Sequence, residues 1–312
     1  MVESRVKTLS YHRAEYLVQN PDTINFGLCV KQATDRCGTV PLRTVTRPSG
    51  RTSRLVHMRA DDQKGYFLHL TVDTPGEYAS VVPKAATGTT EIRVATIPPP
   101  NDAEFMDGDA FLYVRRNDIC LCMTTIRTGA VRDFFDRFFE AAGIRRDARD
   151  FHLVNALDPD KVALLMRKGV EAIDLKGTLH TASVLYAKRK TQAVGIFDVA
   201  RKHFNALIGS PHDVGADGIR AQVILKADKR RSGFAVGYKK LERIAISIIE
   251  NQEDDDDYSI ITKDKQKIKP REIILHSHVE LDSIGKSVDR EQAWEALLRY
   301  YNELETSGHL AQ

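Results

Sequence analysis

The stretch AFLYVRRNDICLCMT, residues 110–124, decides the fold class. Two short apolar segments flank the polar turn Arg116-Asn117-Asp118, which is the pattern of a β-hairpin. Alternation along the first segment puts Leu112 and Val114 on the same face of the predicted sheet. We therefore predict two paired antiparallel strands at the centre of the chain.

A strongly amphipathic helix is predicted directly after this hairpin. Its apolar residues recur at the i, i+3, i+4, i+7, i+8 spacing of one helical face. These residues are Val131, Phe134, Phe135, Phe138, Phe139 and Ala142. Gly143 is placed to end the helix. Such an aromatic stripe is typical of a buried core, so we do not interpret it as a ligand pocket.

Strands and helices are predicted in both halves, and the fold class we expect is α+β. Strand patterns cover 66–72, 91–97, 178–187 and 221–226, with a further hairpin of 258–262 and 272–281 around the basic loop 263–271. Helical patterns cover 161–168 with Asp160 as cap, 188–208, the segment containing Leu241 to Ile249, and a last helix from Ser287 or Asp289 to Gly308.

The length of 312 residues suits two domains of ordinary size. We expect a β-rich domain with one aromatic-faced helix over 1–187, and a basic α+β domain ending in a helix over 188–312. The proline run at 98–102 marks a second possible boundary inside the first domain.

Composition favours a globular protein, with 42% hydrophobic and 29% charged residues. Apolar runs fall far short of the ~20 residues that cross a bilayer. The first residues contain no apolar core of a secretory signal, so we expect a cytoplasmic protein that does not span a membrane. Four cysteines without a Cys-x-x-Cys pair predict reduced, buried thiols and no zinc site; they are Cys29, Cys37, Cys120 and Cys122.

Charge is unevenly distributed although the net charge is only +3. Residues 31–59 contain seven basic residues and one acid, and residues 186–249 contain thirteen basic and five acidic residues. An acidic run at 253–257 opposes them. Clustered cations of this kind are suited to the phosphates of nucleic acid.

We therefore predict binding of DNA through its phosphate backbone, with little sequence preference, because no base-reading motif is present. The residues expected at the phosphates are Lys188, Arg189, Lys190, Lys229, Arg230, Arg231, Lys239 and Lys240. A second patch is expected from Arg43, Arg47, Arg51 and Arg54, whose planar guanidinium groups suit phosphate oxygens.

Catalytic signatures are weak, and we expect binding rather than catalysis, with no catalytic residue, no metal and no cofactor. The enzymatic alternative is a nuclease that binds Mg²⁺ with Asp160 and Asp174 and orients water with Lys176. The helix start at Asp160 speaks against it, because that pattern places the first carboxylate on a strand. His276 and His278 share a strand face but are only two ligands.

Protein association is a third hypothesis. The acidic run at 253–257 of one molecule would meet a basic face of a partner or second subunit. This hypothesis predicts salt-sensitive association of proteins without binding of nucleic acid.

From about Glu104 onward, the chain resembles the phage-exclusion RexA family of lambdoid prophages and their bacterial relatives. The similarity is carried by residues 111–114, 119–123, 124–129 and 131–139. It continues more weakly through 177–187, through 222–226 with the helix after it, and into the helix containing Trp294. The resemblance implies a DNA-binding homodimer that acts in anti-phage defence or abortive infection, with scope for a membrane-protein partner encoded nearby. It implies no catalytic residue, and the arginine-rich segment near the N-terminus lies outside it.

Overall fold

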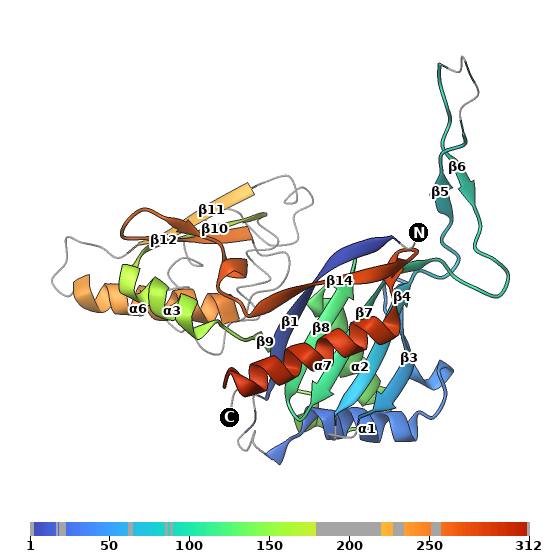
Figure 1. The fold of residues 1–312 in the computed structure, drawn as a ribbon, viewed down its shortest axis with the longest axis horizontal. Coiled ribbons are helices and arrows are strands. Elements are labelled where there is room, and N and C mark those ends of the chain that lie inside the picture. The colour runs from blue at the N-terminus through green and yellow to red at the C-terminus, as the bar shows by residue number, and fades with distance from the viewer. Residues whose placement is uncertain are drawn as a thin grey trace. The chain divides into compact units, whose positions relative to one another are not determined.

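Two compact units make up the chain in the computed structural model (Figure 1). The structure describes residues 3–16, 18, 23–61, 65–84, 87, 90–178, 220–226, 234–250 and 257–310. Unit 1 comprises residues 1–156 and 275–312, and unit 2 comprises residues 157–274. Both contain helices and strands, so the predicted α+β class is confirmed.

Within the described residues, unit 1 is built on a nine-stranded sheet whose strands pair antiparallel. The order is β15-β14-β1-β8-β7-β4-β3-β2, and β9 pairs with the end of β1. The strands are β1 (Ser4–Tyr16), β2 (Thr44–Thr46), β3 (Thr52–Ala60), β4 (Tyr66–Asp73), β7 (Met106–Arg115), β8 (Asp118–Thr124), β9 (Phe151–Asn155), β14 (His276–Ile284) and β15 (Ser287–Val288).

The predicted hairpin 110–124 is confirmed as β7 and β8, and it lies in the middle of this sheet. Every residue from Gly108 to Val114 is buried, because helices cover both faces of the sheet. Leu112 and Val114 join one core, whereas Phe111 and Tyr113 join the other. Strand alternation thus divides one strand between two hydrophobic cores.

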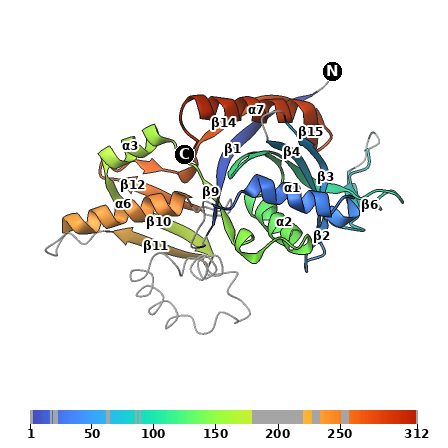
Figure 2. The ribbon, with the colours of Figure 1, turned by 90° about the horizontal axis from the view of Figure 1, so that it is seen from below.

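Helices α1 (Phe26–Arg36) and α2 (Thr128–Ala141) cover one face (Figure 2). The predicted aromatic stripe is buried, and the ring of Phe26 lies edge-on to Phe135 and Phe151, each at 5.1 Å between centroids. Gly143 adopts φ +66° directly after the C-cap of α2, a conformation that ends helices at little cost to glycine.

The opposite face is covered by α7 (Arg290–Thr306), the predicted last helix. Asp289 caps its N-terminus by accepting a hydrogen bond from the amide of Gln292 at 2.9 Å. Trp294 is fully buried, and its indole N–H donates to the Leu68 carbonyl on β4 at 3.1 Å. This helix therefore belongs to the core of unit 1.

A separate hairpin, β5 (Ala79–Val81) and β6 (Ala95–Ile97), stands away from the large sheet (Figure 1). The strand predicted over 91–97 is shorter in the structure, since only 95–97 are paired. The reason is that the rest of the segment has no neighbouring strand among the described residues.

Unit 2 contains a four-stranded sheet in the order β11-β10-β12-β13, packed against helices α3 and α6. Its core contains Val170, Ile173, Leu241, Ala245 and Ile260. The elements are α3 (Pro159–Lys168), β10 (Val170–Thr178), β11 (Arg220–Lys226), α6 (Phe234–Glu250), β12 (Asp257–Thr262) and β13 (Lys267–Ile268). Short 3-10 turns occur at Pro41–Arg43, Arg146–Ala148 and Pro270–Glu272.

Two predictions about this part of the chain need correction. The hairpin of 258–262 with 272–281 is wrong, because β12 pairs with β10 and β13 whereas β14 pairs with β1. Asp158, and not Asp160, caps α3 by accepting from the amides of Asp160 and Lys161. The expected strand 178–187 and helix 188–208 lie outside the described residues, apart from Thr178 at the end of β10.

The division into units also differs from the expected boundary at 187/188. The chain leaves unit 1 after Ala156 and returns to it at Leu275, so unit 2 is inserted within unit 1. The reason is that β14 and α7 complete the sheet and the core of unit 1. None of the helices in the described part of the chain has the length and apolar character that a membrane span requires.

Candidate nucleic-acid interface

The predicted DNA-contacting residues fall into three groups in the structure. Residues 188–190 and 229–231 lie outside the described residues. Lys239 and Lys240 are exposed on α6. The four N-terminal arginines are described in full and are treated below.

Helix α6 presents its lysines to solvent because its buried apolar stripe packs into the core of unit 2. Leu241, Ala245 and Ile248 recur at i, i+4, i+7 and are buried. At 100° per residue, Lys239 lies on the side of the helix opposite this stripe. The packing of α6 against the sheet therefore determines that Lys239 points into solvent.

Lys263, in the turn between β12 and β13, brings a third lysine to the same helix. Its Nζ lies 4.5 Å from the centroid of the Tyr238 ring, the residue that directly precedes Lys239. This cation–π contact connects the β12–β13 turn to α6. Lys263 was not predicted as a site residue. The sequence placed it in a loop between 258–262 and 272–281, and that wrong pairing gave no reason to expect it beside α6.

Gly169 explains how Lys263 reaches this position. The glycine ends α3 with φ +70°, and its carbonyl accepts from the Lys263 amide at 3.0 Å. A Cβ at this position would lie 2.8 Å from Lys263 Nζ. The positive φ, which glycine adopts at little cost, therefore ends α3 beside the β12–β13 turn.

The charges at this end of unit 2 are predominantly positive. Lys168 pairs with Asp264 at 3.3 Å, and Lys265 pairs with Glu171 at 2.5 Å. Hydrogen bonds from the Thr262 hydroxyl and then from Lys168 lower the pKa of Asp264 below its ordinary value, so this carboxylate stays charged. Four cations form no ion pair with any described residue: Arg167, Lys239, Lys240 and Lys263. We call these four residues the basic end of unit 2.

The N-terminal arginines, by contrast, already have partners inside unit 1. Arg47 Nε lies 2.8 Å from Asp133 on α2, and Arg51 lies 3.1 Å from Asp107 on β7. Arg54 pairs with the buried carboxylate of Asp73, and Arg43 donates to the Gly38 carbonyl at 3.1 Å. These contacts give the cluster a structural role in bracing the β2–β3 hairpin.

Neutralising Arg54 should destabilise unit 1 much more than neutralising Arg51. The Asp73 side chain is only 4% exposed, and its second oxygen has no hydrogen-bond partner among the described residues. Arg54→Gln should therefore lower the free energy of unfolding by about 3 kcal/mol, as when one member of a buried pair is removed. Arg51 is 49% exposed, so Arg51→Gln should cost less than about 1 kcal/mol. Urea denaturation measures both, and equal losses would contradict the assignment.

The residues of the nuclease alternative do not share one strand environment. Asp160 is exposed in the first turn of α3, whereas Asp174 is buried on β10. The side chain of Lys176 lies outside what the structure describes. Among described residues, no group of three His, Cys, Asp or Glu side chains is arranged to hold a metal ion.

The two histidines of β14 make contacts with each other and with β1. The rings of His276 and His278 lie 5.3 Å apart, and His278 Nδ1 lies 3.3 Å from Thr8 Oγ1.

The four cysteines are buried and form no disulfide. Burial raises the pKa of Cys122 to about 12, which keeps this thiol protonated and unreactive.

A serine, a histidine and an aspartate meet in unit 1, from strands distant in sequence. Asp109 is fully buried, and its Oδ2 lies 2.9 Å from His69 Nε2 and accepts a hydrogen bond from the Ser287 hydroxyl. Its Oδ1 accepts from the Thr124 hydroxyl. A catalytic triad needs the histidine between the serine and the acid. Here the acid lies between them, which is the arrangement of a buried structural network.

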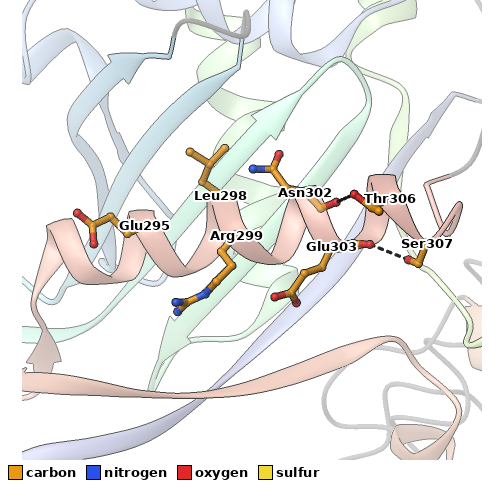
Figure 3. Close-up of a pocket in the computed structure, with 7 residues that line it drawn as sticks. All are labelled: Glu295, Leu298, Arg299, Asn302, Glu303, Thr306 and Ser307. Atoms are coloured by element: carbon orange, nitrogen blue, oxygen red, sulfur yellow. Dashed lines mark hydrogen bonds between the residues drawn. The ribbon is translucent and has the colours of Figure 1, made fainter.

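A shallow surface pocket of about 630 Å³ lies along the outer side of α7 (Figure 3). The described residues that line it are Glu295, Leu298, Arg299, Asn302, Glu303, Thr306 and Ser307. Two carboxylates flank its single arginine, so its charge does not favour phosphate. The basic end of unit 2 is the better candidate for binding an anion.

Comparisons with known proteins assign no family to this chain. Neither the protein-family models nor the curated proteins compared with this chain match its sequence. The resemblance to the RexA family therefore stays a prediction. The candidate interface depends on the residues of unit 2 alone.

Proposed function

We propose that the chain binds double-stranded DNA through its phosphate backbone, using the basic end of unit 2. One observation carries this proposal: four cations from three separate elements lie at one end of the unit without a carboxylate partner among described residues. Exposed ion pairs would have neutralised this charge at little cost. Because these four cations form no ion pair among the described residues, an anionic partner is suited to this surface.

The chemistry of lysine indicates which part of DNA is contacted. An ammonium group is a point charge with rotatable donors, and it binds phosphate oxygens without selecting base edges. Three of the four cations are lysines, so the expected binding depends little on base sequence. The tract Lys229–Arg231 ends shortly before Phe234 in the sequence, so it is a candidate to extend the same surface.

Anti-phage defence is the proposed biological setting. It follows from the RexA resemblance, which also suggests a homodimer and scope for a membrane-protein partner. DNA binding by unit 2 can be tested with the purified protein, whatever its role in anti-phage defence.

Neutralising two lysines of α6 should weaken DNA binding strongly. Lys239→Gln/Lys240→Gln removes two phosphate contacts, and each is worth about tenfold in affinity at about 0.1 M salt through counterion release. We expect the dissociation constant for a short duplex to rise about a hundredfold. Fluorescence anisotropy with the full chain measures it, using two duplexes of unrelated sequence.

The matched control is Lys31→Gln/Lys286→Gln, which removes the same charge from exposed positions of unit 1. Its affinity should stay within about threefold of that of the unmodified protein. If both variants bind DNA equally weakly, net charge alone explains the loss of affinity, and the basic end of unit 2 is not the binding surface. Repeating the reactions with Mg²⁺ tests the nuclease alternative, for which the duplex would be cut and the cutting lost in Asp174→Ala.

A further inference from the structure

Two lysines outside the basic end extend the positive charge of unit 2 onto its sheet. Lys226 is the last residue of β11, and Lys267 is the first residue of β13. Both are exposed, and neither forms an ion pair with a described residue. We call these two residues the sheet lysines. Within the described residues, β11 and β13 are the two edges of the four-stranded sheet.

Strand register places the sheet lysines in one row across the sheet. Ala172 on β10 pairs with Lys226 on one side and with Ile261 on the other. Ile261 in turn pairs with Lys267. Directly paired residues of neighbouring strands point to the same face of a sheet. Three strand spacings separate the two lysines by about 14 Å at the backbone.

This row faces away from the helices of unit 2. The residues next to it on three of the strands are Ile173, Ile260 and Ile268, and all three belong to the core that packs against α3 and α6 (Figure 1). Successive residues of a strand point to opposite faces of the sheet. The sheet lysines therefore lie on the face opposite to the helices.

The row also lies at the same end of the sheet as the basic end of unit 2. Ile261 is followed by Thr262, which ends β12, and then by Lys263 in the turn. Lys263 extends to the helix side, where it contacts Tyr238 on α6. This end of the unit thus carries two lines of cations, the basic end on the helix side and the sheet lysines on the outer face of the sheet.

Neighbouring carboxylates leave the sheet lysines unneutralised. Glu171 pairs with Lys265 at 2.5 Å, and Asp264 pairs with Lys168 at 3.3 Å. Asp174 lies on the same sheet face as the row, but it is buried and forms no ion pair with either sheet lysine. The positive charge of this face is therefore available to an anion in solution.

We infer that unit 2 contacts both strands of a DNA duplex, with the basic end at one strand and the sheet lysines at the other. This inference rests on the proposed binding of DNA. Lys239 points away from the sheet, so the two lines are separated by at least the diameter of a helix, about 10–12 Å. This separation exceeds the ~6 Å width of the minor groove and matches the ~12 Å width of the major groove. Phosphates on the two sides of a major groove can therefore meet both lines at once.

Contact with two strands predicts that the sheet lysines contribute to the binding of duplex DNA alone. A single strand offers one line of phosphates, and the basic end has more cations with which to bind it. The same single strand would reach the sheet lysines only by folding around the end of the unit. The duplex presents its second strand at a fixed distance, so it meets these lysines without such folding.

Neutralising the sheet lysines tests this difference. Lys226→Gln/Lys267→Gln removes two phosphate contacts from the second strand. Fluorescence anisotropy with the full chain at about 0.1 M salt should show the dissociation constant for a short duplex rising about a hundredfold, and that for either of its single strands rising less than about threefold. Lys226→Arg/Lys267→Arg keeps both charges and should bind the duplex within about threefold of the unmodified protein.

Two further variants separate this inference from the proposed function. Lys31→Gln/Lys286→Gln removes the same charge from unit 1 and should leave both affinities within about threefold. Lys239→Gln/Lys240→Gln should weaken the binding of duplex and single strand alike. If it does, while Lys226→Gln/Lys267→Gln binds the duplex like the unmodified protein, the sheet lysines only protect the sheet edges, and the inference is wrong although DNA binding stands.

Two other results would also overturn the inference. If Lys226→Gln/Lys267→Gln binds duplex and single strand equally weakly, both lines of cations contact the same strand. If the unmodified protein binds neither form of DNA at low salt, the proposed function fails and the inference fails with it.

Discussion

Replacing Trp294 with alanine is expected to lower the free energy of unfolding by about 3–5 kcal/mol, the range for truncating a large buried aromatic side chain. The ring is fully buried between α7 and the sheet, 5.5 Å from Phe67 between centroids. The guanidinium groups of Arg59 and Arg290 lie 4.8 and 5.1 Å from its centroid, and Glu291 pairs with both arginines. The substitution therefore removes core packing and the support of a charged cluster together.

Circular dichroism in urea is the appropriate measurement, because Trp294 is the single tryptophan and its fluorescence disappears with it. Trp294→Phe serves as the control, since it keeps an aromatic ring and loses the hydrogen bond to Leu68. It should cost about half as much or less. A loss below about 1 kcal/mol in the alanine variant would mean that α7 is not part of the core.

Replacing Asp109 with alanine is the second substitution with a large expected effect, again about 3–5 kcal/mol. The carboxylate is the shared acceptor for Ser287 and Thr124 and the partner of His69. Removing it leaves three buried or half-buried polar groups without their acceptor, and each carries a desolvation cost. The three groups come from β15, β8 and β4, so the network connects strands across the sheet.

Asp109→Asn is the informative comparison, because it keeps the shape and one acceptor oxygen. Its loss should be clearly smaller than that of Asp109→Ala when both are unfolded in urea. Equal losses would show that side-chain volume, and not the hydrogen bonds, accounts for the stabilisation.

Local patterns predicted the elements whose burial depends on their own periodicity. The hairpin 110–124, the aromatic helix ending at Gly143 and the helix containing Trp294 are all confirmed. In each case the apolar spacing extends over several turns or residues and needs no partner to be recognised.

Pairing between distant segments could not be predicted in this way. Ser4 lies opposite Asp282 in the β1–β14 pair, and no local signal specifies that pairing. The strand 272–281 was therefore matched with its nearest neighbour in sequence, which also misplaced the boundary between the units. Side-chain partners could not be predicted either. Arg54 on β3 pairs with Asp73 on the neighbouring strand β4, and Lys263 in the β12–β13 turn contacts the ring of Tyr238 on α6. The sequence shows where cations lie along the chain, but it does not show which of them form ion pairs in the folded protein.

We propose that the basic end of unit 2, whose four cations form no ion pair among the described residues, binds the phosphates of DNA. The most direct test is the salt dependence of duplex binding by the full chain. If about five phosphates are neutralised, the logarithm of affinity should fall with the logarithm of salt concentration at a slope near −4 to −5. In Lys239→Gln/Lys240→Gln the magnitude of the slope should decrease by about two, and in Lys31→Gln/Lys286→Gln it should not change. Absence of binding at low salt, or one slope shared by all three proteins, would contradict the claim.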